Sequence, residues 1–267
     1  MHASFPDTWI LVSLGGLLVG FLIGMTGVGG GSVTTPMLIS GFGVAPALAV
    51  GTDLLFASIT KASAAWRHHK YGNVDWAIFG YLACGSLTST LITLAWLKFA
   101  HPDTTLLASV IRTVLIGALV ASSLAVSLVP WWLRRHGSQG TPEMRSAPRP
   151  IPTVLYGLLV GALVTLTSVG AGAIGVAILI MLYPNLAARR IVGTDIVHAI
   201  PLAFISGVGH LSMGNVDFGL LGALLIGSIP GIMLGSRLVG AFPDWLLRLL
   251  LSVVLIYAAY LLYTFAH

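Results

Sequence analysis

The chain has 267 residues, of which 57% are hydrophobic and only 8% are charged. A soluble domain carries about a quarter charged residues, so a soluble fold of this size could not cover its surface with polar groups. Apolar runs of about 20 residues recur along the whole length and predict a polytopic helical membrane protein. The formal net charge of +5 could indicate a nucleic-acid or other anionic partner. The basic residues fall between apolar segments, however, where they set the orientation in the membrane, so we expect lipid and no nucleic acid as a partner.

Five apolar segments occupy the first half of the chain. The second of them contains Pro36 and a Gly-Phe-Gly sequence at 41–43, which predict a short or bent helix. The polar run 67–70 after the third segment, followed by Gly72 and Asn73, predicts a loop with a turn. The five segments cover residues 9–25, 31–49, 46 or 52 to 66, 74–97 and 104–129.

A long polar stretch at residues 131–150 separates the two halves and contains four arginines and three prolines. Its composition is typical of a linker. The predicted organisation is a first repeat at 1–130, the linker at 131–150 and a second repeat at 151–267. The five apolar segments of the second half cover residues 151–169, 172–183, 191–209, 216–238 and 245–265.

The second half repeats the first. The stretch from Gly20 to Ser32 returns 141 residues later as Gly161 to Ala173. At a shift of 142 residues, the Gly-Thr-Asp sequence at 51–53 returns at 193–195 and the Gly-Asn-Val-Asp sequence at 72–75 returns at 214–217. Six of the eight acidic residues fall in three repeat-related pairs, so the chain is a duplication.

The positive charges favour an inverted arrangement of the repeats. If each half crosses the membrane five times, ten of the 13 Lys and Arg residues lie in loops on one face, Lys98 lies alone on the other, and Lys61 and Arg112 lie within spans. If segments 31–49 and 172–183 were re-entrant, the same charges would divide six and five between the faces. Because positive loops mark the cytoplasmic side, we expect two inverted repeats of five transmembrane segments each, a cytoplasmic linker, and both termini outside the cytoplasm. The ten residues are Arg67, Lys70, Arg134, Arg135, Arg145, Arg149, Arg189, Arg190, Arg237 and Arg248.

Each repeat carries a glycine-rich break in an apolar run. Backbone groups freed inside a bilayer are costly unless they are buried in protein or face a watery cavity, although the glycines alone could serve only close helix packing. A helix that restarts after such a break points unpaired N–H groups and its positive dipole end at the break, and such ends hold anions. In an inverted repeat the two breaks converge near the midplane, which predicts one anion site between the halves. The predicted substrate-binding residues are Thr26, Gly27, Val28, Gly29, Gly30, Gly31 and Ser32 of the first break and Thr167, Ser168, Val169, Gly170, Ala171 and Gly172 of the second.

The ordered set of motifs resembles the TauE/SafE family of sulfite and organosulfur-anion permeases over nearly the whole chain. The resemblance implies a bacterial-type inner-membrane transporter for small anions, often sulfur oxyanions or sulfonates. It rests on the stretch from Gly20 to Ser32 with Pro36 after it, on Gly51, Thr52 and Asp53, on the sequence at 72–75, on Gly85 and Ser86, and on their second-half counterparts. The second break departs from the first in three places, with Ala171 for Gly30, Ala173 for Ser32 and Ala177 for Pro36.

Four ionisable residues inside the predicted spans are candidates for proton coupling or gating. Asp53 and Asp195 each follow Gly-Thr, so each could be a proton site for coupled transport or a first-turn carboxylate of a helix capped by that threonine. His198 shares a helix face with Asp195 and could relay protons or simply pack. Lys61 could attract the anion or snorkel to the interface. The aspartates of the two Gly-Asn-Val-Asp sequences are expected to cap helices.

These features predict a secondary carrier that moves a small anion by alternating access, with sulfite or a related sulfur oxyanion or sulfonate as the expected substrate. A passive anion channel would use the same breaks without a titrating carboxylate. A metal carrier using His68, His69, His198 and His210 and a membrane-embedded enzyme are further alternatives, although neither Gly-Xaa-Ser-Xaa-Gly nor His-Glu-Xaa-Xaa-His occurs. We therefore expect a multi-pass inner-membrane protein with no enzymatic activity, no metal and no cofactor.

Overall fold

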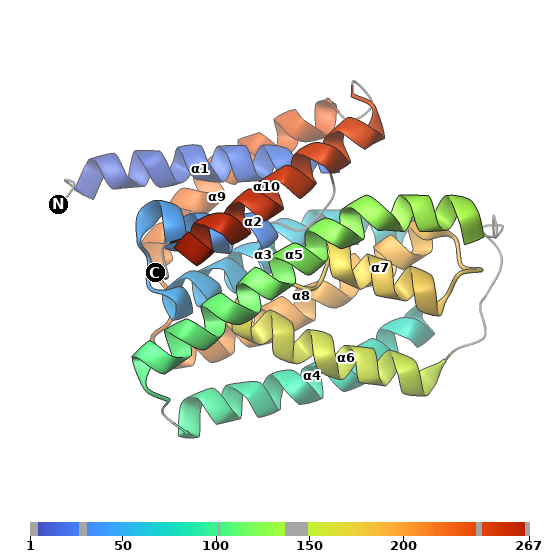
Figure 1. The fold of residues 1–267 in the computed structure, drawn as a ribbon, viewed down its shortest axis with the longest axis horizontal. Helices are drawn as coiled ribbons and strands as arrows, with labels where there is room; N and C mark the ends of the chain where they lie inside the picture. Colours follow the sequence, from blue (N-terminus) through green and yellow to red (C-terminus); the bar gives the residue numbers. More distant parts are fainter. Residues whose placement is uncertain (1–4, 27–30, 101, 137–148, 239–241, 265–267) are drawn as a thin grey trace.

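The structure is a computed structural model that describes residues 5–26, 31–100, 102–136, 149–238 and 242–264. Within these ranges all regular secondary structure is helical, which confirms the predicted all-α fold (Figure 1). The elements are α1 (Phe5–Thr26), α2 (Gly31–Pro36), the π-helical turn η1 (Met37–Gly41), α3 (Pro46–Lys70), α4 (Trp76–Phe99), α5 (Thr104–His136), α6 (Pro150–Thr167), α7 (Ala173–Leu182), α8 (Ala188–Ser212), α9 (Phe218–Arg237) and α10 (Asp244–Thr264).

Seven helices of the described ranges, α1, α4, α5, α6, α8, α9 and α10, are long and apolar enough to cross a membrane. This confirms a polytopic membrane protein. α3 has 25 residues but is more polar, because it carries Asp53, Lys61 and the basic run at its end. α2 has six residues, η1 five and α7 ten. At about 1.5 Å per residue, α2 with η1, and likewise α7, covers only about half of the hydrocarbon core, so these two segments are partial spans.

The loop predicted at residues 67–70 is wrong, because α3 continues through Lys70. Gly72 ends the helix with a φ of +65°, a left-handed conformation that glycine adopts without strain. The N–H groups of Gly72 and Asn73 donate to carbonyls of the last helical turn at 3.0 and 2.9 Å, as in other glycine-terminated helices. The polar run therefore marks where α3 leaves the apolar region and not where the helix stops.

The start of the predicted linker is also helical, since α5 runs through residues 131–136 to His136. Residues 137–148 of the linker lie outside the described residues. Here too the polar residues continue a helix that the apolar pattern would end earlier.

Three aspartates cap helices. Asp75 and Asp217 accept hydrogen bonds from the backbone N–H groups of the second and third residues of α4 and α9, which confirms their predicted role. Asp103 precedes α5 and accepts hydrogen bonds from the hydroxyl and the backbone N–H of Thr105. These bonds hold the pKa of the Asp103 carboxyl below its usual value.

The long helices pack in pairs that combine one helix from each half of the chain. α1 packs along α9, and α6 packs along α4 (Figure 1). Because the repeat matches α1 with α6 and α4 with α9, the first helix of each half lies against the fourth helix of the other. The remaining long helices pair with their own counterparts, α3 with α8 and α5 with α10. The duplication seen in the sequence is therefore also present in the packing.

Glycines let the exchanged pairs approach backbone to backbone. A Cβ atom added at Gly20 of α1 would overlap the backbone of Ser228 in α9, and one added at Gly161 of α6 would overlap the backbone of Ser86 in α4. Small residues at such interfaces replace the hydrophobic driving force that lipid removes. For Gly20 and Gly161, which begin the glycine-rich motif of each repeat, close packing is thus the role that the contacts support.

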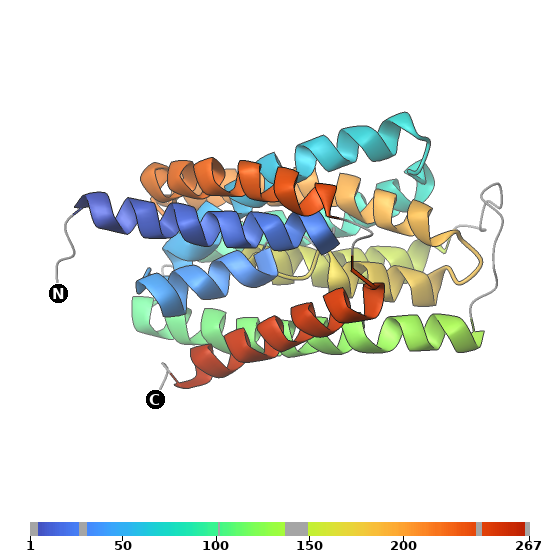
Figure 2. The same ribbon diagram turned by 90° about the horizontal axis from the view of Figure 1, so that it is seen from above.

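The helix directions separate the two ends of the bundle. α1 begins and α10 ends at one end, whereas α5 ends and α6 begins at the other, and α1 and α6 run in opposite directions (Figures 1 and 2). The ends of α3, α5 and α9 and the starts of α6, α8 and α10 lie at this second end, and they carry the described basic residues that we predict on one face. The end of α4, with Lys98, lies at the opposite end.

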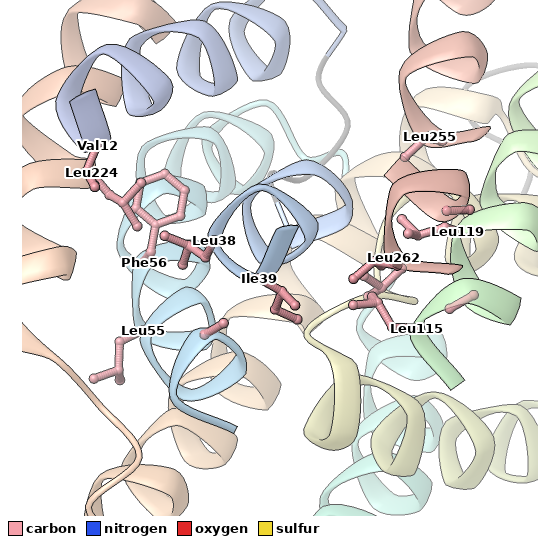
Figure 3. Close-up of a cluster of buried hydrophobic side chains, with 14 of the residues drawn as sticks. Val12, Leu38, Ile39, Leu55, Phe56, Leu115, Leu119, Leu224, Leu255 and Leu262 are labelled. Carbon is pink, nitrogen blue, oxygen red and sulfur yellow. The ribbon is translucent and has the colours of Figure 1, made fainter. Parts of the chain in front are cut away.

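Each short helix rests on its own apolar core. Leu38 and Ile39 of η1 are buried with Phe56 of α3, Leu224 of α9 and Leu262 of α10 (Figure 3). A second cluster holds α7 through its buried side chains and those of α6 and α8; its members include Leu179, Ile180, Tyr183, Val160, Val164, Ile191 and Leu202. Both cores belong to the protein interior, so the buried faces of these short helices stay away from lipid.

The glycine contacts predict a position-specific loss of stability. Gly20→Ala should lower the free energy of unfolding by about 1–3 kcal/mol, because the added methyl group meets backbone that cannot rotate away. Thermal unfolding of purified protein in detergent, followed by size-exclusion chromatography, would measure the shift. Gly80→Ala is the matched control, because a Cβ at this exposed α4 position meets nothing within 4 Å. Equal melting temperatures for the two variants would contradict this account of the α1–α9 interface.

Candidate functional site

The start of α2 touches the second backbone break inside the bundle. A Cβ atom at Gly31, the first residue of α2, would overlap the carbonyl oxygen of Ser168 and lie 3.1 Å from its hydroxyl. Ser168 and Gly31 are both buried. The first residue after the first break therefore lies against the second break. Four of the predicted binding residues, Gly27, Val28, Gly29 and Gly30, lie outside the described residues.

The second break is unwound by left-handed backbone. Ser168, Gly170 and Gly172 have φ angles of 60°, 129° and 139°. The Thr167 hydroxyl donates to the carbonyl of Leu163 at 2.7 Å and accepts the N–H of Val169 at 3.1 Å, which fixes where α6 ends. α7 then starts at Ala173 without a side-chain cap. Its first-turn N–H groups consequently have no partner within the helix.

The hydroxyls at the breaks do not all face the same way. Thr26 donates to the carbonyl of Leu22 at 2.6 Å, four residues earlier in its own helix, as Thr167 does in the second repeat. Ser32 and Ser168 are buried between the halves. Ser168 lies near the Asp53 carboxylate without a well-formed hydrogen bond to it.

Asp53 is held by hydroxyls of the short helix α2. Thr35 donates its hydroxyl to Oδ2 of Asp53 at 2.6 Å, and Thr34 lies beside the same carboxylate. Asp53 is completely buried. Oδ1 has no partner among the described residues. The first-repeat carboxylate thus joins α3 to the helix that follows the break.

Asp195 has a different environment. It is buried, and Oδ1 packs so closely on Gly175 that a Cβ atom there would overlap it. The same Cβ would lie 3.1 Å from the hydroxyl of Tyr156 in α6. At the shift of 141 residues, Gly175 and Val176 replace the two threonines that surround Asp53. Among the described residues none donates a hydrogen bond to the Asp195 carboxylate.

Lys61 reaches into the break instead of snorkelling to the interface. Its Nζ donates to the carbonyl of Ala171 at 3.2 Å, across the contact between α3 and the second half. The ammonium interacts electrostatically with both Asp195 and Asp53. The half-buried Lys61 therefore interacts with both repeat-related carboxylates, and its repeat counterpart is Ala203.

His198 bonds α4 rather than Asp195, although the two share a helix. Its Nε2 lies 2.7 Å from the hydroxyl of Ser86 in α4, and its ring meets Phe79 edge to face. His210, one of the histidines considered for a metal, instead places Nε2 2.9 Å from the carbonyl of Thr165. Within the described residues no three His, Cys, Asp or Glu side chains gather in a way that could hold a metal ion.

The predicted capping role of Thr52 and Thr194 is wrong, because both lie well inside helices. Each threonine instead binds the other repeat: Thr194 accepts the N–H of Asp75 at 2.8 Å, and Thr52 accepts the N–H of Asp217 at 3.0 Å. The glycine before each threonine lets the loop approach, since a Cβ at Gly193 would overlap the carbonyl of Asn73. The Gly-Thr-Asp and Gly-Asn-Val-Asp sequences therefore form two interlocks between the halves.

Sequence reasoning missed Tyr156 and Gly175, which complete the surroundings of Asp195. Tyr156 sits in an apolar run and resembles a packing residue. Aligning the repeats gives the only sequence signal, because Tyr156 corresponds to Gly15 and Gly175 to Thr34. The cross-repeat interlocks also leave a signal, since both motifs recur in both halves with the same spacing.

Comparison with known sequences identifies the relatives of this bundle. A sequence model described as "Sulfite exporter TauE/SafE" matches residues 12–262. The chain belongs to the TauE/SafE family. No solved structure matches it.

Curated relatives of this TauE/SafE protein are described as transporters. It is 37% identical over 222 residues to "Probable membrane transporter protein YjnA" of Bacillus subtilis, covering 81% of this chain and 84% of that protein. It is 27% identical over 217 residues to "Probable membrane transporter protein YdhB" of the same organism, covering 79% and 82%. A Haemophilus influenzae "Probable membrane transporter protein" is 27% identical over 170 residues, covering 61% and 59%. The family membership supports a membrane transporter.

The interlocks of this TauE/SafE protein predict that removing the hydroxyl oxygen of Thr194 lowers the stability of the fold. Thr194→Val keeps the shape but leaves the buried N–H of Asp75 without its acceptor, which should cost about 1–3 kcal/mol. Thr88→Val is the control, because that exposed hydroxyl bonds only the carbonyl of Cys84 in its own helix. Thermal unfolding in detergent would compare the two variants. A melting temperature for Thr194→Val equal to that of Thr88→Val would argue against the interlock.

Proposed function

We propose that this TauE/SafE protein is an inner-membrane secondary transporter for a small anion, by alternating access around a midplane site where the two breaks meet. Sulfite or a related sulfur oxyanion or sulfonate is the proposed substrate, in line with the family description. The observation that carries the proposal is the half-buried ammonium of Lys61 on the carbonyl of Ala171, close to the contact of Gly31 with Ser168. The protein acts without enzymatic chemistry or a cofactor.

The chemistry of the site supports an oxyanion. Lys61 supplies a positive charge, and the uncapped start of α7 supplies backbone donors and the positive end of a helix dipole. Oxygen atoms of a tetrahedral or pyramidal anion accept hydrogen bonds from such groups. A cation would meet repelling donors here, which favours an anion over the metal considered from the histidines.

The repeat architecture supports alternating access. α1 and α6 run in opposite directions, and each half packs its first helix on the fourth helix of the other (Figures 1 and 2). In an inverted-repeat transporter each half can adopt the conformation that the other half had. This exchange, related by the pseudo-two-fold axis, opens the midplane site to the other side of the membrane. A fixed channel would not need this exchange.

The charges at the site support coupling to protons. One ammonium between two buried carboxylates leaves one negative charge in excess when all three groups are ionised, and uncompensated buried charge is costly. Uptake of a proton by one carboxylate removes that excess and permits an incoming anion. Asp53, Asp195 and Lys61 are the residues proposed for this coupling, while His198 is placed against Ser86 and acts at most on α4.

Lys61→Ala tests the anion site, and it introduces the residue that the second repeat has at the matched position, Ala203. Loss of the cation should lower the affinity for sulfite and for a sulfonate by at least about tenfold. Uptake of the labelled anions into proteoliposomes and calorimetric titration would measure transport and binding.

Lys98→Ala is the control for Lys61→Ala, because that lysine is exposed in the last turn of α4. Undiminished binding and uptake in Lys61→Ala, with correct folding, would refute the site. Flux through the wild-type protein that ignores an imposed proton gradient would favour the passive channel.

We further propose that the basic end of the bundle is cytoplasmic and that both termini lie outside the cytoplasm, following the positive-inside rule. With Cys84, which is exposed, replaced by Ser, Lys70→Cys should resist a membrane-impermeant thiol reagent in intact cells and Lys98→Cys should react. Permeabilised cells should label both. The reverse labelling pattern would invert the proposed orientation.

A further inference from the structure

Tyr156 carries a buried hydroxyl that nothing in the described structure satisfies. The residue is 7% exposed, and its OH has no hydrogen-bond partner. Buried hydroxyls are normally bonded, so an unpartnered one calls for a ligand or water. The hydroxyl points at Gly175, in the first turn of α7.

The start of α7 adds donors at the same place. The first helical hydrogen bond of α7 runs from the N–H of Val176 to the carbonyl of Gly172 at 2.8 Å. The three N–H groups before Val176 therefore have no acceptor inside the helix. Together with the Tyr156 hydroxyl they form a set of donors at the positive end of a ten-residue helix.

One acidic group lies in this donor set. Asp195 places Oδ1 against Gly175 on the side where the Tyr156 hydroxyl lies. The charged or titratable groups that face Asp195 are Lys61 from α3 and Tyr156 from α6. α7 contributes only the backbone at Gly175, and on the α4 side Ser86 is bonded to His198. An ionised Asp195 would repel an anion at the start of α7, whereas a protonated one would donate a hydrogen bond to it.

The matched carboxylate does not have this arrangement. Asp53 accepts the Thr35 hydroxyl, so one of its oxygens already has a donor from the protein. At the first repeat, Gly15 takes the place of Tyr156 and leaves no hydroxyl next to Asp53. The two acids therefore differ in their neighbours although their sequence contexts are the same.

We propose that an oxyanion binds at the start of α7 between the Tyr156 hydroxyl and a protonated Asp195, so that each bound anion is accompanied by one proton on that carboxyl. This inference rests on the proposed anion transport and assigns its coupling to one site. The proton comes from solvent, forms the O–H bond of Asp195 and is donated as a hydrogen bond to the anion. When the anion leaves, the carboxyl releases the proton and Lys61 again neutralises the carboxylate.

The test is calorimetric titration of the purified full-length protein with thiosulfate and with methanesulfonate, which stay ionised between about pH 5 and about pH 8. Titration in buffers of different ionisation heat counts the protons taken up with each anion. The wild-type protein should take up about one proton per anion and lose about tenfold in affinity for each pH unit above the titration range of the carboxyl.

Three variants separate the roles, each checked for a monodisperse folded protein. Asp195→Asn should bind without proton uptake and with an affinity that does not change with pH. Tyr156→Phe should bind about tenfold more weakly at every pH while proton uptake stays at the wild-type value. Thr35→Val, which removes the hydroxyl donor of Asp53 and keeps the charge of that carboxylate, should keep the pH slope.

The outcomes distinguish this inference from the proposed function. Wild-type binding without proton uptake, an unchanged pH slope in Asp195→Asn, or undiminished affinity in Tyr156→Phe would overturn the assignment and leave the anion carrier standing. A changed pH slope in Thr35→Val, with an unchanged one in Asp195→Asn, would move the proton to Asp53 in the first repeat and also overturn it. A wild-type protein that binds neither anion would contradict the proposed function itself.

Discussion

The structure depends on keeping a lysine ammonium and an unwound backbone inside a membrane protein. Lys61 places its charge on the carbonyl of Ala171, and two carboxylates face the same ammonium. An unpaired charge and an unpaired backbone carbonyl are both costly in lipid. The Lys61 ammonium and the Ala171 carbonyl satisfy each other, and protein around them keeps lipid away. The exchanged packing of α1 with α9 and α4 with α6 supplies that surrounding wall.

Duplication built the scaffold, and divergence between the copies placed the polar groups. The interlocks, the helix caps and the glycine contacts occur in both halves and hold the fold. Lys61, Tyr156 and His198 occur once each, opposite Ala203, Gly15 and Phe56. Most residues that are the same in both repeats therefore stabilise the fold. The residues that differ give the two halves different polar groups near the second break and α4.

The sequence sufficed for features that follow from polarity along one segment, such as the long apolar spans and the caps at Asp75 and Asp217. Full crossings were expected at residues 31–49 and 172–183, whereas α2 with η1, and likewise α7, are too short to cross the hydrocarbon core. The sequence also failed where polar residues continue a helix beyond the membrane, as at residues 67–70. The roles of Thr52 and Thr194 were misjudged because their partners are backbone groups of the other repeat, which no local pattern contains. The role of Tyr156 could not be predicted for a similar reason. Only its contact with Gly175 in the folded structure distinguishes it from a packing residue.

The two interlocks differ in one ion pair. Arg190 approaches Asp75 at 3.9 Å at the basic end, and the equivalent of Arg190 in the first repeat is the apolar Leu48. In the alternating-access cycle that we propose, perfect symmetry would give the two closed forms the same energy. A partly exposed pair contributes up to about 1 kcal/mol, enough for roughly a fivefold bias in populations. In that proposed cycle the ion pair would favour the form that keeps the basic end closed when no anion is bound.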